Sequence, residues 1–94
     1  FSEELSNTFK YMDVYETDTA FNLKPHYHND FESRLFLEGN ATFIINGETV
    51  ECSRGSYIEI YPEIIHSFEY DGKEHLKVLR YFKENASWDA TFVD

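Results

Sequence analysis

The sequence predicts an all-β domain, built as a small barrel or sandwich. Nine Phe and seven Tyr against one Met and two Pro favour strands over helices. About seven or eight short apolar or alternating segments are separated by turn residues, a pattern typical of a sandwich or barrel. The chain of 94 residues suffices for one domain, and 41% hydrophobic residues can form its core.

The N-terminal part of the chain begins with a polar stretch, residues 1–8, that we expect to be a loose arm. The alternation over residues 9–15 predicts a strand. Residues 16–25 are expected to form a loop that ends at Pro25, and this proline favours an extended conformation at Lys24. Residues 26–38 combine a histidine-rich stretch with an apolar run that ends before Gly39.

The second half of the chain contains the clearest local signal. Asn46-Gly47 lies between the β-rich segments 42–45 and 48–51, and this pair predicts a hairpin with a type I′ turn. Further strands are expected over residues 56–61, 66–70 and 75–82. Residues 83–94 lack clear periodicity, and no helix of normal length, internal repeat or low-complexity tract is predicted.

Charge and composition exclude several classes of partner. Eight Lys and Arg against eighteen Asp and Glu give a net charge of −10, which argues against nucleic acid and anionic membranes. There is no signal-peptide core and no apolar stretch of spanning length. The single Cys52 excludes an internal disulfide and suits a reducing compartment, so we expect a cytoplasmic location and a small-molecule partner.

A group of histidines and one carboxylate predicts a metal site. His26 and His28 are two residues apart and would lie on one face of a strand, and Glu32 follows at another even offset. His66 follows a short apolar run. Imidazole and carboxylate ligands suit Fe(II), Ni(II), Mn(II), Cu(II) or Zn(II). The alternative is that His26 and His28 are ordinary histidines on the surface of a strand. His75 lies outside the group and is expected to face solvent.

The spacing of these residues resembles the motifs of the cupin superfamily. His26-x-His28, Glu32 and Gly39 match the first motif, although Ala20 stands where its leading glycine is usual. The segment from Gly55 to His66 resembles the second motif, with Pro62 one place late and Glu63-Ile64 where a glycine is usual. The resemblance implies a double-stranded β-helix, or jelly-roll, barrel as a single domain over residues 1–94. By the same analogy a homodimer is a possible assembly.

Within the cupins the chain is most similar to acireductone dioxygenase, over roughly residues 25–90. The matching stretches are His26-Tyr-His28, Glu32-Ser-Arg34, Leu37-Glu38-Gly39, His66-Ser-Phe68, Val78-Leu-Arg80-Tyr-Phe82 and Trp88. The resemblance implies a metal, iron or nickel first, held by the residues that match the family ligands: His26, His28, Glu32 and His66. It also implies an arginine near the metal (Arg34), a second arginine (Arg80) and an aromatic substrate shell (Phe68 and Trp88). The chain departs from the family in lacking an N-terminal region, in a shorter hairpin and in having Phe31 where an acidic residue is usual.

Chemistry independent of the resemblance favours a chelated substrate. Four protein ligands on an octahedral metal leave two positions, which the two oxygens of an enediol could occupy. Arg34, two residues past Glu32, points to the same interior and could hold the negative charge of the enolate. The alternative for Arg34 is a structural ion pair with Glu59 or another acid, and for Arg80 the two roles are evenly balanced. Phe68 is expected to pack the core more than to touch substrate, although the two roles overlap in a small barrel, and Trp88 could equally cap the barrel end.

Three functions remain open from the sequence. The first is a dioxygenase that cleaves an acireductone-like enediol in methionine salvage, as the resemblance implies, with Arg34 and Arg80 as catalytic residues. The second is a metal-dependent isomerase or lyase acting on a small sugar or keto acid. The third is a cupin that binds a small molecule without turning it over.

Overall fold

The computed structural model describes residues 10–83 and 90–93, and within these ranges every regular element is a strand. The expected arm over residues 1–8 and Trp88 lie outside the described residues. No described segment is a helix that could cross a membrane. The nine strands are β1 (Tyr11–Thr17), β2 (Phe21–Tyr27), β3 (Glu32–Glu38), β4 (Ala41–Ile45), β5 (Glu48–Cys52), β6 (Tyr57–Ile60), β7 (His66–Tyr70), β8 (Leu76–Phe82) and β9 (Thr91–Phe92).

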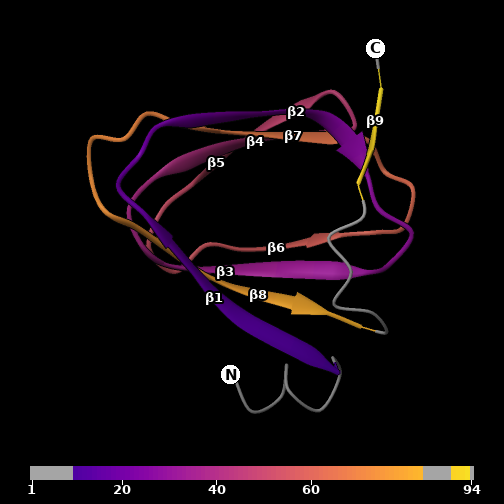
Figure 1. Ribbon diagram of the computed structural model, residues 1–94, viewed down its shortest axis with the longest axis horizontal. Helices are drawn as coiled ribbons and strands as arrows, with labels where there is room; N and C mark the ends of the chain where they lie inside the picture. The colour runs from indigo at the N-terminus through magenta and orange to yellow at the C-terminus, as the bar shows by residue number, and fades with distance from the viewer. Residues whose placement is uncertain (1–9, 84–89, 94) are drawn as a thin grey trace.

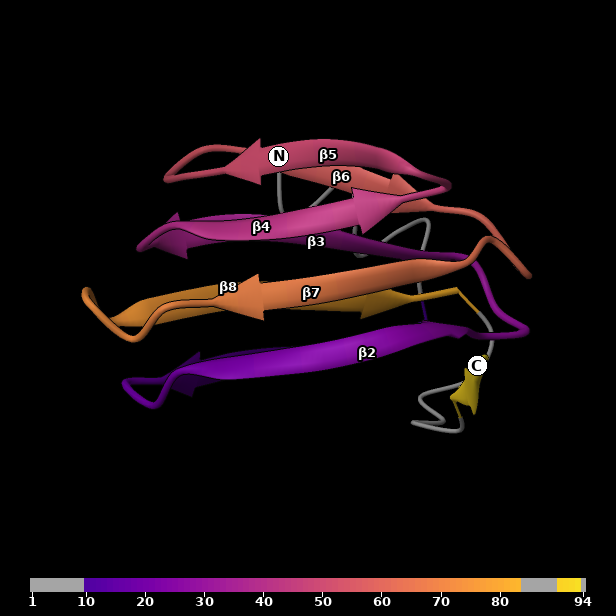
Figure 2. The same cartoon turned by 90° about the horizontal axis from the view of Figure 1, so that it is seen from above.

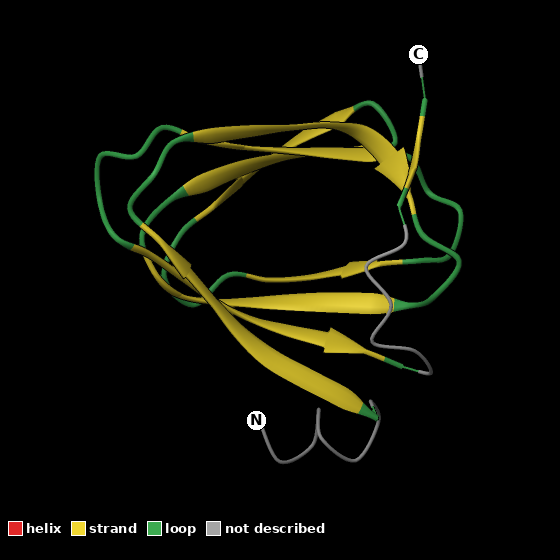
Figure 3. Ribbon diagram, in the orientation of Figure 1, coloured by secondary structure: helices red, strands yellow, loops and turns green. Residues whose placement is uncertain are grey.

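These strands form two antiparallel sheets that face each other (Figure 1). One sheet has the order β1-β8-β3-β6, and the other has the order β5-β4-β7-β2-β9. Except for the β4–β5 hairpin, the chain crosses from one sheet to the other at each connection from β1 to β8. This is the double-sheet arrangement of a jelly roll and confirms the predicted all-β fold (Figures 2 and 3).

The predicted hairpin is confirmed in detail. β4 and β5 pair from Ala41↔Cys52 to Ile45↔Glu48, so only Asn46 and Gly47 connect them. Their φ angles are 50° and 85°, the two positive values that a type I′ turn requires. The Asn-Gly pair therefore sets the register of this edge of the sheet.

Two stretches that we expected to be irregular are strands. The expectation of a loop over residues 16–25 is wrong, because β1 continues to Thr17 and β2 already begins at Phe21. Pro25 does not end β2, since the pairing of β2 with β7 shifts register between Leu23 and His26. An irregularity of this kind tolerates a residue without an N–H. The aperiodic C-terminal region also supplies the two-residue strand β9.

The space between the sheets is filled mainly by aromatic side chains. Phe43 of β4 and Phe68 of β7 stack with their centroids 4.0 Å apart, and Phe36 of the facing sheet contacts both rings edge-on. All three side chains are buried. This packing supports the ends of β2, β3 and β7, where the candidate site lies.

Candidate metal centre

The predicted ligands meet at one end of the space between the sheets. His26 of β2 pairs in register with His66, the first residue of β7. His28 lies just past the end of β2, and Glu32 is the first residue of β3 in the opposite sheet. The expectation that Glu32 joins the histidines on one face of a single strand is therefore wrong. The chain turns between His28 and Glu32, and the carboxylate reaches the imidazoles from across the barrel.

The three imidazoles converge on one point. One ligand nitrogen from each of His26, His28 and His66 lies within 4.8 Å of the other two. One carboxylate oxygen of Glu32 is 3.6 Å from His66 Nε2, and the other is 3.8 Å from His28 Nε2. Glu32 is completely buried, and His26 and His66 are almost so. Three nitrogens and one carboxylate could hold a divalent metal there.

Backbone carbonyls orient two of the three imidazoles. The Nδ1 atom of His26 lies 2.6 Å from the carbonyl oxygen of Lys24, and Nδ1 of His66 lies 3.0 Å from that of Ile64. A carbonyl only accepts, so each Nδ1 carries the proton and each Nε2 keeps its lone pair. Histidines that bind a metal through one ring nitrogen usually donate a hydrogen bond from the other nitrogen in this way.

Burial keeps these imidazoles neutral at pH 7. Loss of hydration lowers the pKa of His66 to about 4, although its hydrogen bond to Ile64 acts in the opposite direction. The same cause lowers the pKa of His26. A neutral imidazole is the form that binds a metal, so proton competition at these two residues is weak near neutral pH.

The hydrogen bonds of the buried Glu32 carboxylate show whether the four predicted ligands fit a metal. Its Oε1 accepts a hydrogen bond from Arg34 Nη2 at 3.1 Å, whereas its Oε2 has no hydrogen-bond partner among the described residues. A buried carboxylate oxygen without a partner is costly, and a bound cation would compensate for it. The donor set and this oxygen both fit a divalent ion.

Arg34 lies beside the group and is paired with it. Its guanidinium also donates to the carbonyl of Ser33 at 3.2 Å and stacks 5.4 Å from the ring centroid of Phe82. Burial lowers the pKa of Arg34, and the charge of Glu32 opposes that shift. The acid that pairs with Arg34 is Glu32 and not Glu59, which instead accepts a hydrogen bond from Tyr57.

Arg80 is held by Asp13 and Tyr15, for which the sequence predicted no role. Its Nε and Nη2 each donate to the carboxylate of Asp13 at 2.8 Å, and its guanidinium lies 4.8 Å from the ring centroid of Tyr15. Asp13 and Arg80 are directly opposite across β1 and β8, and Arg34 is the next residue in that row, on β3. Only the pairing of these distant strands reveals the contact.

A cavity of about 430 Å³ opens beside the imidazoles. Its remaining lining includes both arginines, Phe68, and three residues without a predicted role: Leu23, Phe43 and Phe92. A second cavity of about 330 Å³ shares Leu23, Arg34, Phe68 and Arg80 with it and extends toward Tyr15 and Phe21. Phe68 therefore both packs the core and lines the cavities, as we considered possible. Trp88 lies outside the described residues, so its predicted role stays a prediction.

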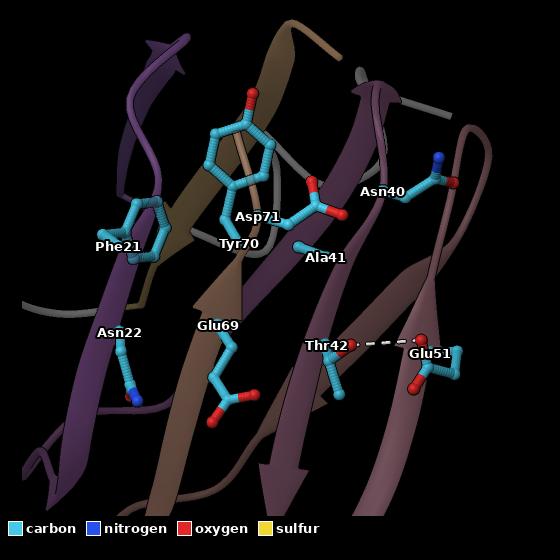
Figure 4. A pocket seen from close by; sticks show the side chains of 9 residues that line it. All are labelled: Phe21, Asn22, Asn40, Ala41, Thr42, Glu51, Glu69, Tyr70 and Asp71. Atoms are coloured by element: carbon cyan, nitrogen blue, oxygen red, sulfur yellow. Dashed lines mark hydrogen bonds between the residues drawn. The ribbon is translucent and has the colours of Figure 1, made fainter. Parts of the chain in front are cut away.

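Two polar features lie apart from this group. A hollow on the outer face of the five-stranded sheet is lined by exposed Glu51, Glu69 and Asp71, and Thr42 donates to Glu51 at 3.1 Å (Figure 4). No imidazole lines it. His75 is exposed, as expected, and its two ring nitrogens contact Glu16 and Asp18 at 2.9 and 2.8 Å. These carboxylates raise the pKa of His75.

Similar solved structures support the fold. The polyketide cyclase RemF from Streptomyces resistomycificus has a TM-score of 0.72 and 20% sequence identity, over 88% of this chain and 59% of that one. A cupin protein from Bacteroides fragilis has a TM-score of 0.60 and 19% identity, over 83% of this chain and 70% of that one. At this level of identity the likeness shows the cupin fold alone.

Sequence comparisons identify the family. Acireductone dioxygenase of Leptospira biflexa is 37% identical over 75 residues, which are 76% of this chain and 42% of the relative. The enzyme of a Hydrogenobaculum strain is 32% identical over 75 residues, 76% of this chain and 41% of the relative. The chain thus spans about two fifths of the length of these relatives. A model of the ARD/ARD' family matches residues 3–90, and the chain belongs to that family.

Proposed function

We propose that this chain binds a divalent metal through His26, His28, Glu32 and His66 and acts as a dioxygenase on an acireductone-like enediol. The observation that carries the proposal is the convergence of three imidazole nitrogens within 4.8 Å, next to a buried carboxylate oxygen without a partner. Membership of the ARD/ARD' family supports the reaction class. Iron or nickel is the proposed metal, and manganese, zinc and copper suit the same donors.

The charges around the cavity favour an anionic substrate. Glu32 is paired with Arg34 at 3.1 Å and Asp13 with Arg80 at 2.8 Å, so each arginine is balanced by its own carboxylate. With neutral imidazoles, the charge of a bound divalent ion is then left for the substrate to balance. Such an ion, when bound, polarises a coordinated oxygen and lowers the pKa of a bound hydroxyl group. An enediol that ionises meets this requirement.

The protein's own groups would orient the substrate and exclude water. Arg34 is held by Glu32 and by the carbonyl of Ser33, so its guanidinium has a fixed direction beside the imidazoles. A planar guanidinium binds two oxygens of an anion at once, which the ammonium of lysine does not do. The stacked and buried rings of Phe43 and Phe68 form an apolar part of the cavity wall. We propose Arg34 and Arg80 as the residues that hold the substrate.

The metal assignment is tested by replacing ligands. His28→Ala and His66→Ala should each lose most bound nickel or iron, while far-UV circular dichroism shows an intact fold. His75→Ala is the matched control, because that imidazole lies outside the group and should leave metal content unchanged. Stoichiometric metal in both ligand variants would reject the assignment.

The reaction is tested with metal-reconstituted protein. Iron and nickel forms are mixed with an acireductone without oxygen, oxygen is then admitted, and its uptake is recorded against the His66→Ala variant. We expect uptake above that control with at least one metal. Equal uptake by the variant and the unchanged protein would reject the dioxygenase. Anaerobic turnover would instead favour the isomerase or lyase, and binding without turnover the ligand-binding cupin.

A further inference from the structure

The short C-terminal strand β9 places an aromatic ring on the metal centre. β9 pairs with β2 through His26↔Phe92 and Tyr27↔Thr91, and the amide of Val93 donates to the carbonyl of Pro25 at 3.1 Å. Phe92 is therefore the direct cross-strand neighbour of His26. Residues in this position place their side chains on the same face of the sheet.

His26 is enclosed by a neighbour on each side of its strand. Its ring centroid lies 4.3 Å from that of His66 on β7 and 5.3 Å from that of Phe92 on β9. His26 is only 2% exposed, whereas Phe92 is 56% exposed. Phe92 thus covers the imidazole on the β9 side while its other surface faces solvent. It also lines the cavity beside the imidazoles.

This contact complements the hydrogen bond that orients His26. The bond from Nδ1 to the carbonyl of Lys24 fixes one edge of the ring, and an edge contact alone still permits the ring to tilt. A neighbouring ring limits that motion and keeps water away from the imidazole. A metal site with restrained ligands loses less ligand freedom on binding. The match to the ARD/ARD' family ends at residue 90, so the family resemblance carries no role over to Phe92.

We infer that Phe92 is a positioning residue of the metal centre, which holds the imidazole of His26 in its ligand orientation and shields it from water. The inference rests on the proposed metal site. β9 forms the edge of its sheet next to β2, so it covers the side of His26 that lies away from β7.

The test compares Phe92→Ala and Phe92→Leu with a matched control, Tyr61→Ala. Tyr61 is also an exposed aromatic residue, 59% accessible, and its ring lies 4.9 Å from that of Phe31. It does not line the cavity beside the imidazoles. The first readout is the proton NMR spectrum of the histidine rings in metal-free protein. The second is the affinity for Ni(II), measured by competition with a chromophoric chelator.

We expect Phe92→Ala to move the His26 ring signals, leave those of His75 in place, and weaken Ni(II) binding by about threefold to tenfold, the range that an aromatic pair contributes. Phe92→Leu should fall between Phe92→Ala and the unchanged protein, and Tyr61→Ala should bind nickel normally. Unchanged nickel affinity in Phe92→Ala, or an equal loss in Tyr61→Ala, would overturn the inference. If Phe92→Ala does not fold, Phe92→Leu decides by the same criteria. Absence of nickel binding by the unchanged protein would reject the metal centre itself, a result distinct from failure of Phe92 alone.

Discussion

Replacement of Glu32 by Gln should separate the structural and the metal-binding roles of this carboxylate. In metal-free protein Glu32 compensates Arg34 at 3.1 Å, and both side chains are buried. The Gln side chain keeps the size and one hydrogen-bonding oxygen, so the variant removes the charge and replaces the second oxygen by an NH2 donor. An uncompensated buried charge costs about 3–5 kcal/mol. This is a large part of the total of about 5–15 kcal/mol that stabilises a typical domain.

The assay is urea unfolding in the presence of a metal chelator, monitored by circular dichroism. With a denaturant dependence of about 1–2 kcal/mol per molar urea, the midpoint should fall by about 1.5 M or more. The double variant Glu32→Gln, Arg34→Met should recover most of the loss, because it removes the unpaired cation as well. Glu59→Gln, at an exposed carboxylate, is the control and should have little effect. A loss below about 1 kcal/mol, or no recovery in the double variant, would refute the reasoning.

The same variants report on the metal when the chelator is omitted. A ligand at 100 times its dissociation constant stabilises the native state by about 2.7 kcal/mol. We expect nickel to stabilise the unchanged protein and Glu59→Gln in this way, and to stabilise neither variant that lacks the Glu32 carboxylate. Equal stabilisation of all of them would show that Glu32 is no ligand, whatever its role in pairing with Arg34.

Three further predictions concern positions around the site. Asp13→Asn should cost at most about 1 kcal/mol of stability, since the ion pair with Arg80 is partly exposed. It should strengthen catechol binding to nickel-loaded protein, because Arg80 then has no carboxylate to balance its charge, and unchanged catechol affinity would count against Arg80 as an anion-binding residue. Gly39→Ala should destabilise the protein more than Gly47→Ala by at least about 1 kcal/mol in thermal unfolding. Both glycines have a positive φ, but of the two only Gly39 would place the new Cβ against backbone, 2.5 Å from a carbonyl oxygen. Equal losses in the two variants would contradict this. The pKa of His75 is raised above its unfolded value of 6.5 by Glu16 and Asp18. The stabilisation from these ion pairs is therefore complete below pH 6.5 and is lost as the pH rises through the pKa of His75 in the folded protein. Stability relative to His75→Gln should therefore fall as the pH rises above about 6.5, and a flat difference would argue against the ion pairs.

Local signals in the sequence predicted those parts of the fold that local chemistry determines. The Asn46-Gly47 pair specifies its turn because few residue pairs tolerate two positive φ angles, and the structure has that turn. Pro25 was predicted to end a loop, but it lies within β2. Proline is excluded from regular ladders, but the register shift in β2 provides a place where its missing N–H is not needed. A shift of that kind depends on the partner strand, which sequence spacing does not reveal.

The candidate site likewise contains residues that the local sequence predicts and residues that only strand pairing brings to it. The residue types and spacing of the four predicted ligands resembled a known motif, so they could be named without a structure. The prediction that Glu32 shares a strand face with the histidines is nevertheless wrong, because an even offset places side chains on one face only within a continuous strand and the chain turns between His28 and Glu32. Asp13 and Phe92 could not be predicted, because each reaches the site through strand pairing, Asp13↔Arg80 and His26↔Phe92, between segments 67 and 66 residues apart. No periodic pattern in either segment marks such a contact.

The position of Glu32 in the sheet opposite the histidines has a mechanical consequence for the barrel. His26 and His66 belong to the five-stranded sheet, His28 follows directly on β2, and Glu32 begins a strand of the four-stranded sheet. Four ligands within one sheet would stiffen only that sheet, whereas an ion bound by these four would join the two sheets at one end. Ligand binding that bridges two elements protects both from local opening. Nickel should therefore slow amide hydrogen exchange at the start of β3 as well as in β2 and β7. Protection confined to β2 and β7 would mean that the histidines bind the metal without the carboxylate.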